Sequence, residues 1–177
     1  EDFEGELLHT GSWPVEPVDF TNKKVAIIGT GSSSIQSIPV IAQEAKELYV
    51  FQRTANYSIP SNNGPMDQEE EKLVKSRYQE FREENYLNGF GIAGLEEEAL
   101  AVEATEDERR IKFEDRWKKE GLGFLGAYSD LMFDQDANKL AANFVRQKIM
   151  QLVDDQETAK LLSPEHCIGG KRLCVDT

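Results

Sequence analysis

A glycine-rich turn near residue 30 has the residue types and spacing of a dinucleotide-binding loop. Gly29-x-Gly31-x-x-Ser34 matches Gly-x-Gly-x-x-Gly with serine at the third position. The first glycine permits a tight turn, the second lets backbone approach a pyrophosphate, and the third allows close helix packing, for which serine is still small. Negative charge is favoured at the helix N-terminus that would follow. Hydroxyl groups surround the N–H groups there: Thr30, Ser32 and Ser33.

Arg53 indicates which dinucleotide this turn would select. Chains that bind NAD usually carry Asp or Glu about 20 residues further on, where it accepts hydrogen bonds from the ribose hydroxyls. The corresponding segment here reads Gln52-Arg53-Thr54 and is not acidic. A planar guanidinium suits a 2′-phosphate. We therefore expect NADP(H) rather than NAD, the alternative being an ordinary surface arginine.

The elements that position these residues predict an α/β fold. Residues 25–28 form a short apolar run, typical of a strand buried on both faces. A helix is expected from about 35 to 45, with Pro39 in its early part, and a second strand at 48–51. This order is the first βαβ of a Rossmann-like NADP-binding domain, here partial, which we assign to residues 21–62.

Residues 63–165 change to a charged, helical pattern, which we expect to be a large helical insertion. Thr105-x-x-Glu108 fits a capping box opening a helix that carries Ile111 and Trp117. Apolar residues recur at helical spacing in two further stretches: Val74, Tyr78 and Phe81, then Ala141, Val145, Ile149 and Leu152, with Phe144 beside them.

Composition excludes several classes of partner. The net charge is −13, from 33 acidic and 20 basic residues, so nucleic acid and anionic membranes would be repelled. No apolar run approaches the ~20 residues of a membrane span, and no secretory signal opens the chain. We expect a cytoplasmic protein.

The two histidines and two cysteines lack the spacing of a zinc site, so no metal is expected. Cys167 and Cys174 are expected to be reduced, and the alternative is a disulfide between them.

A motif near the start of the chain resembles the Baeyer–Villiger monooxygenase family. Residues 3–14 are similar to the family pattern Phe-x-Gly-x-x-x-His-x-x-x-Trp-Pro, whose Trp-Pro ending related N- and S-oxygenating flavin monooxygenases lack. The resemblance covers essentially the whole chain, and Ser34 departs from it where the family usually has glycine. Three further segments resemble the family's NADPH-binding domain: 29–36, 50–54 and 171–174.

The resemblance implies a role for each candidate residue. Arg172 resembles the active-site arginine that lies against flavin and nicotinamide. His9 resembles the motif histidine that couples domain movement to catalysis. Without the family, both are ordinary structural or surface residues. The 2′-phosphate of NADP would bind Arg53, Thr54 and Lys171, and its pyrophosphate and nearby ribose would bind Gly29, Thr30, Gly31, Ser32, Ser33 and Gln36.

The resemblance also implies a reaction and a domain order. In this family NADPH reduces FAD, and reduced flavin and O2 form a C4a-peroxide that converts a ketone to an ester or lactone. Arg172, always protonated, would stabilise the negative charge on the peroxide and then on the former carbonyl oxygen. Residues 1–20 would be an interdomain linker, and residues 166–177 would return to the NADPH-binding domain.

The chain has one dinucleotide fingerprint where the family has two, so FAD would be bound by parts outside it. We therefore expect a piece of a longer protein that binds NADP but is inactive alone, its partner being the FAD domain of the parent chain. Ketone substrate and O2 would act in the full enzyme. Two other functions stay open: a non-catalytic NADP-binding module, and an N- or S-oxygenating flavin monooxygenase, against which Trp13-Pro14 and Arg172 argue.

Overall fold

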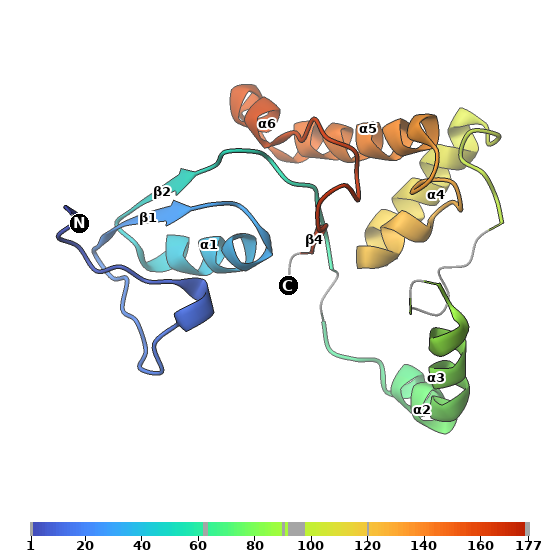
Figure 1. Cartoon of the computed structure of the whole chain (residues 1–177), viewed down its shortest axis with the longest axis horizontal. Helices are drawn as coiled ribbons and strands as arrows, with labels where there is room; N and C mark the ends of the chain where they lie inside the picture. Colours follow the sequence, from blue (N-terminus) through green and yellow to red (C-terminus); the bar gives the residue numbers. More distant parts are fainter. Residues whose placement is uncertain (1, 62–63, 90, 92–97, 120, 176–177) are drawn as a thin grey trace. The chain divides into compact units, whose positions relative to one another are not determined.

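The chain forms two compact units, Glu1–Thr54 and Ala55–Thr177 (Figure 1). The computed structural model describes residues 2–61, 64–89, 91, 98–119 and 121–175. Within these residues, no helix combines the length and apolar character needed to cross a bilayer.

The first unit is a βαβ arrangement, as predicted. Strand β1 (Lys24–Ile28) pairs in parallel with β2 (Glu47–Phe51), in a register that runs from Lys24 opposite Glu47 to Ile28 opposite Phe51. Helix α1 (Ser32–Glu44) connects them, and a short 3-10 helix, η1 (Thr10–Ser12), precedes β1. The strands therefore point the same way, and their carboxyl ends lie side by side.

Helix α1 begins earlier than the sequence indicated. It starts at Ser32, directly after the glycine turn, so Pro39 lies in the middle of the helix rather than in its early part. A proline there has no N–H to donate to the carbonyl of Ile35, one turn before it. The helix continues regardless, and ends with the N–H of Ala45 on the carbonyl of Ile41 at 2.8 Å.

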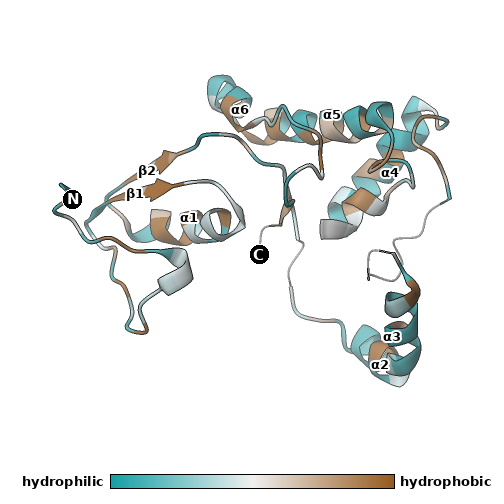
Figure 2. Ribbon diagram, in the orientation of Figure 1, coloured by the Kyte–Doolittle hydropathy of each residue, from teal (hydrophilic) through white to brown (hydrophobic). Residues whose placement is uncertain are grey.

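The expectation that β1 is buried on both faces was wrong. Its residues alternate between exposed and half-buried, and Ile28 is 86% exposed. The reason is that two strands and one helix cannot cover both faces of a sheet, although the strands themselves are strongly apolar (Figure 2). A continuous apolar run indicates that a strand is suited to burial on both faces. The first unit alone does not contain enough elements to bury β1 in that way.

The second unit is mainly helical. Its core is aromatic, built by α4 (Glu106–Lys119), the 3-10 helix η2 (Gly121–Gly126) and α5 (Gln135–Leu152). Phe113 lies 5.4 to 5.6 Å, between ring centroids, from three other buried rings: Phe124, Tyr128 and Phe144. The half-buried Trp117 packs edge-on against two of these rings. Trp117 and Phe144, which the sequence predicted to lie on helices, therefore pack in this aromatic core.

Local signals set the helix starts. The capping box is confirmed: the N–H of Thr105 donates to Glu108 Oε2 at 2.8 Å, and the N–H of Glu108 donates to Thr105 Oγ1 at 3.3 Å. The predicted stripe on α5 is confirmed from Ala141 to Ile149, but Leu152 is 70% exposed because the helix ends there. Aspartates cap three helices: α2 (Gln68–Ser76), α5 and α6 (Gln156–Leu162).

The end of the described chain returns to the start of the second unit. Strand β4 (Cys174–Val175) pairs in parallel with β3 (Ser58–Ile59). The N–H of Cys174 also donates to the carbonyl of Tyr57 at 2.9 Å. Helices α2 and α3 (Tyr78–Leu87) pack on each other, and their surfaces are largely hydrophilic (Figure 2). In these helices Val74 and Tyr78 are exposed rather than buried.

Candidate functional site

The glycine turn follows the carboxyl end of β1. Gly29 has φ +102°, a conformation that favours glycine, and its N–H donates to the carbonyl of Phe51 at 2.8 Å. The turn is therefore joined to the end of β2. In parallel α/β sheets, ligands bind outside the carboxyl ends of the strands.

The N-terminus of α1 can accept an anion. Gly31 is its N-cap, with no side-chain hydrogen bond to the cap, and the first turn has no acidic residue. A β-carbon on Gly31 would have no heavy atom within 4 Å, and its φ of −82° is open to any residue. Neither backbone nor packing in this chain thus requires glycine there, whereas close approach of a phosphate does. The residues present fit the pyrophosphate of a dinucleotide.

The remaining candidate residues of α1 lie in its first two turns. Ser33 and Gln36 are exposed, whereas Ser32 and Ser34 are half-buried. The helix accommodates Ser34 at the place of the third glycine. The carbonyls of Ser33 and Ser34 accept from the hydroxyl of Ser37 at 2.5 and 3.5 Å.

A hydrogen bond joins the segment after β2 to the glycine turn. The hydroxyl of Thr30 donates to Gln52 Oε1 at 3.0 Å, and both residues are half-buried. Arg53 and Thr54 follow and are exposed. The structure thus brings the glycine turn and the predicted 2′-phosphate segment to one end of one sheet. Neither of the two loops carries an acidic residue.

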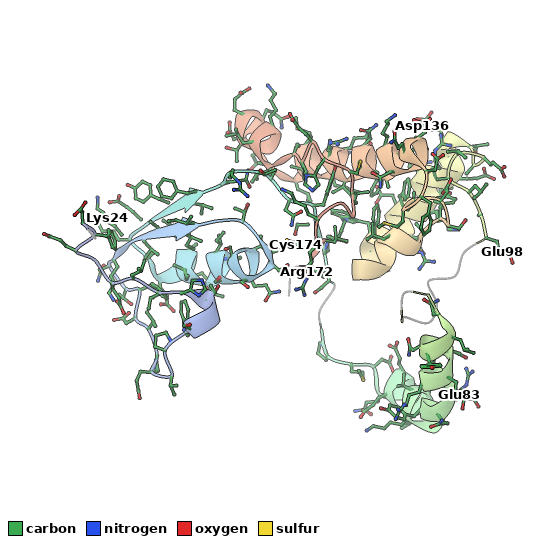
Figure 3. The ribbon with its side chains drawn as sticks, in the orientation of Figure 1. Lys24, Glu83, Glu98, Asp136, Arg172 and Cys174 are labelled. Carbon is green, nitrogen blue, oxygen red and sulfur yellow. The ribbon has the colours of Figure 1, made fainter. Side chains whose placement is uncertain are left out.

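The charged groups of this sheet lie at its other end. Lys24 Nζ and Glu47 Oε1 are 3.0 Å apart, where the two strands begin (Figure 3). Hydrogen bonds from Tyr49 and Lys24 lower the pKa of Glu47. The carboxylate therefore stays ionised and paired, well along the strand from Gln52.

His9 has a visible structural role. It is exposed, forms the N-cap of η1, and its Nδ1 accepts the N–H of Gly11 at 3.1 Å. Trp13, of the same motif, is 44% exposed, with its ring centroid 6.3 Å from that of Phe20. These contacts are local, and the coupling role of His9 stays a prediction.

Lys171 and Arg172 belong to the second unit, whereas the glycine turn belongs to the first. Both are exposed and directly precede the buried pair Leu173 and Cys174 (Figure 3). Asn56 holds this segment: its Nδ2 lies 2.9 Å from the carbonyl oxygen of Arg172, to which it donates, and 3.1 Å from Cys174 Sγ.

A tight turn leads into the basic pair. The N–H of Gly170 donates to the carbonyl of Cys167 at 3.0 Å, and Gly169 has φ +82°, as in the third position of a type II turn. Asn138 of α5 fixes this turn. Its side chain donates to the carbonyl of Ile168 at 2.9 Å and accepts the N–H of the same residue at 3.1 Å.

A second contact from α5 supports the chain just before that turn. Arg146 Nε donates to the carbonyl of Pro164 at 2.7 Å, and its Nη2 donates to the hydroxyl of Tyr57 at 2.9 Å. The hydroxyl of Tyr57 donates in turn to the carbonyl of His166 at 2.8 Å. Burial raises the pKa of Tyr57. Burial, then Lys171 and Arg146, lower the pKa of His166, whose ring nitrogens are buried.

Sequence reasoning missed the residues that support Lys171 and Arg172. Arg146 and Tyr57 are 89 positions apart, and Asn56 and Arg172 are 116 apart. No spacing rule connects residues so distant in the chain. Among the described residues, no cluster of His, Cys, Asp or Glu could hold a metal ion.

The chain is similar to known monooxygenases along its whole length, although no family model matches it. It is 40% identical over 178 residues to a Baeyer–Villiger monooxygenase of Pseudooceanicola batsensis, covering 98% of this chain and 32% of the relative. It is 36% identical over 185 residues to the 2-oxo-Delta(3)-4,5,5-trimethylcyclopentenylacetyl-CoA monooxygenase of Pseudomonas putida, covering 100% of this chain and 34% of the relative.

The chain is also similar to a solved structure and to a relative named as an N-monooxygenase. An oxidized steroid monooxygenase bound to NADP is 45% identical, with a TM-score of 0.93 over 99% of this chain and 34% of its own. A phenazine N-monooxygenase of Lysobacter antibioticus is 33% identical over 178 residues, covering 98% of this chain and 32% of the relative. The chain spans about a third of the length of the relatives it matches. Over these residues it is similar to Baeyer–Villiger monooxygenases, and its structure matches a portion of a steroid monooxygenase that was solved with NADP bound.

Proposed function

We propose that this chain binds NADP(H) at the carboxyl ends of β1 and β2, as the NADP-binding portion of a flavin-dependent Baeyer–Villiger monooxygenase. The observation that carries the proposal is the N-terminus of α1, whose N-cap Gly31 makes no side-chain hydrogen bond, together with Arg53 two residues after β2. One end of the sheet thereby offers both a pyrophosphate site and a cation for the 2′-phosphate.

Each candidate residue has a defined part in this proposal. Arg53 and Thr54 would bind the 2′-phosphate together with Lys171. Arg172 would lie against the nicotinamide, and His9 would transmit movement of the linker. The pyrophosphate and nearby ribose would bind the residues of the glycine turn and the first turns of α1: Gly29, Thr30, Gly31, Ser32, Ser33 and Gln36.

The chemistry of the parent enzyme would be shared with parts outside this chain. When bound, NADPH would supply a hydride, and FAD held by the rest of the parent chain would activate O2. The residues of this chain orient NADP and provide the fixed positive charge of Arg172. When a ketone is attacked, its carbonyl oxygen becomes negative, and a permanently protonated guanidinium stabilises that charge by on the order of 3 kcal/mol.

A second candidate function is N-oxygenation, favoured by the similarity to a phenazine N-monooxygenase. Oxidation of a ring nitrogen generates no carbonyl-derived oxyanion, so Arg172 would have no such charge to stabilise. In the parent enzyme we therefore expect Arg172→Ala to abolish ester formation while NADPH still reduces the flavin. Retained ester formation would contradict this role of Arg172.

The cytoplasmic location expected from the sequence stays a prediction.

Calorimetric titration of this chain with NADP+ and NAD+ tests NADP binding. We expect NADP+ to bind at least about tenfold more tightly, which corresponds to about 1.4 kcal/mol. Arg53→Ala should weaken NADP+ binding and leave NAD+ binding nearly unchanged. Arg82→Ala, which removes an exposed arginine of α3, is the matched control and should change neither. Equal affinities of the wild-type chain for both dinucleotides would contradict the proposal.

A further inference from the structure

We infer that Asn138 is a positioning residue for Lys171: its side chain holds the turn before Lys171, so that the ammonium group needs little further ordering when the coenzyme binds. The inference rests on the proposed function, in which Lys171 binds the 2′-phosphate. It goes beyond that function because it assigns a part in coenzyme binding to a buried residue of α5, in the helical part of the chain.

The amide of Asn138 is fully occupied by backbone groups. Its Nδ2 donates to the carbonyls of Leu131 and Ile168, both at 2.9 Å, and its Oδ1 accepts the N–H of Ile168 at 3.1 Å. Asn138 is 8% exposed and Ile168 is 1% exposed. Buried polar groups that lose their partners are costly to leave unpaired. The three hydrogen bonds therefore fix the backbone of Ile168 to the start of α5, three residues before Lys171.

Lys171 lies between two fixed points of the backbone. Before it, Ile168 is held by Asn138. After it, the carbonyl of Arg172 accepts from Asn56 Nδ2 at 2.9 Å. The backbone at Lys171 can therefore move far only if one of these two asparagine contacts is released.

The backbone also determines where the ammonium group can reach. The side chain of Lys171 is exposed, and within the described part of the chain no carboxylate forms an ion pair with it. A lysine loses rotamer freedom when it binds a phosphate, and a mobile backbone would add to that loss. Because Asn138 holds the turn in advance, this added loss is small.

A double-mutant cycle on this chain tests the inference. Calorimetry measures the NADP+ and NAD+ affinities of the wild type, Asn138→Leu, Lys171→Ala and the double variant. We expect Asn138→Leu to weaken NADP+ binding about three- to tenfold, the range for ordering one flexible side chain. The same change should have little effect when Lys171 is already alanine, because effects that act through one residue are not additive. NAD+ has no 2′-phosphate, so its binding should stay nearly unchanged.

Ile149→Ala is the control for lost stability. Ile149 packs against the aromatic core near the end of α5, whereas Asn138 lies near its start. This variant should lower the midpoint of thermal unfolding and leave the ratio of NADP+ to NAD+ affinity unchanged. If Asn138→Leu does not fold, Asn138→Ser decides, since a serine hydroxyl is too short to reach both backbone groups of Ile168.

The outcomes separate this inference from the proposed function. A wild-type chain without preference for NADP+ would overturn the proposed function, and the inference with it. A wild-type preference that Asn138→Leu changes no more than Ile149→Ala would overturn the inference alone. An equal effect of Asn138→Leu with and without Lys171 would do the same, as would Lys171→Ala with undiminished NADP+ affinity, since nothing would remain to be positioned.

Discussion

The side chain of Asn56 joins the start of β3 to Arg172, donating from Nδ2 to the arginine's carbonyl oxygen at 2.9 Å. Its own Oδ1 accepts the N–H of Tyr57 at 3.1 Å, so the amide is held at both ends. The position of the backbone at Arg172 determines the point from which its side chain extends. The candidate active-site arginine is therefore positioned by a residue more than a hundred positions earlier in the chain.

Asn56→Ala should destabilise the second unit by about 1 kcal/mol, the usual net contribution of one hydrogen bond. The exposed carbonyl of Arg172 can be solvated by water, which keeps the loss moderate. Urea unfolding of the chain measures it. Gln147→Ala removes an exposed side-chain amide from α5 and is the control. An equal change in both variants would show that the contact between Asn56 and Arg172 adds no stability.

Thr105→Ala should destabilise the chain by about 1 kcal/mol, because the start of α4 loses its capping hydroxyl. The hydroxyl and the N–H of Thr105 also donate hydrogen bonds to the carboxylate of Glu108, and these lower the pKa of Glu108. The stabilisation from Glu108 is thus present above its unfolded pKa and is lost as the pH falls through its folded pKa. Unfolding at neutral and acidic pH should show a wild-type advantage over Thr105→Ala that shrinks in acid; an advantage that is constant with pH would contradict the capping box.

His166 should make the chain less stable in mild acid. Burial first, then Lys171 and Arg146, lower the pKa of its folded-state imidazole below the ordinary value of 6.5. Above the ordinary pKa value the imidazole is neutral in both the folded and the unfolded chain. Below it the unfolded chain takes up a proton that the folded chain resists, so stability falls as the pH drops toward the folded pKa.

The variant His166→Phe isolates this effect, since phenylalanine keeps an aromatic ring against Tyr57 and does not titrate. The two rings are 5.2 Å apart between centroids in the wild-type chain. Between about pH 7.5 and 5.5, the variant should lose less stability than the wild type. Identical losses in both proteins would rule out His166 as the source of the pH dependence.

Gly169→Ala should destabilise the turn before Lys171 by about 1–3 kcal/mol, the range for strained backbone. Gly169 has φ +82°, and a β-carbon there would lie 2.7 Å from Met132 Cε. Gly64→Ala is the control, because its β-carbon would meet no heavy atom within 4 Å. Comparable midpoints of thermal unfolding for the two variants would contradict the strain argument.

The parts of the structure that the sequence predicted are those with local signals. The strands on either side of α1 follow from short apolar runs, and the start of α4 follows from Thr105 and Glu108. The burial of β1 and of Leu152 could not be predicted in this way, because burial depends on which elements pack nearby. The same holds for Asn56, Asn138 and Arg146, whose partners are brought close only by the fold.

Amide NMR of the 15N-labelled chain can locate bound NADP, which we expect at the carboxyl ends of β1 and β2. During titration with NADP+, the largest shift changes should fall in residues 29–36 and 52–54, and NAD+ at the same concentrations should produce smaller changes at 52–54. Shift changes that leave the glycine turn unaffected, or that are the same for both dinucleotides, would contradict the claim.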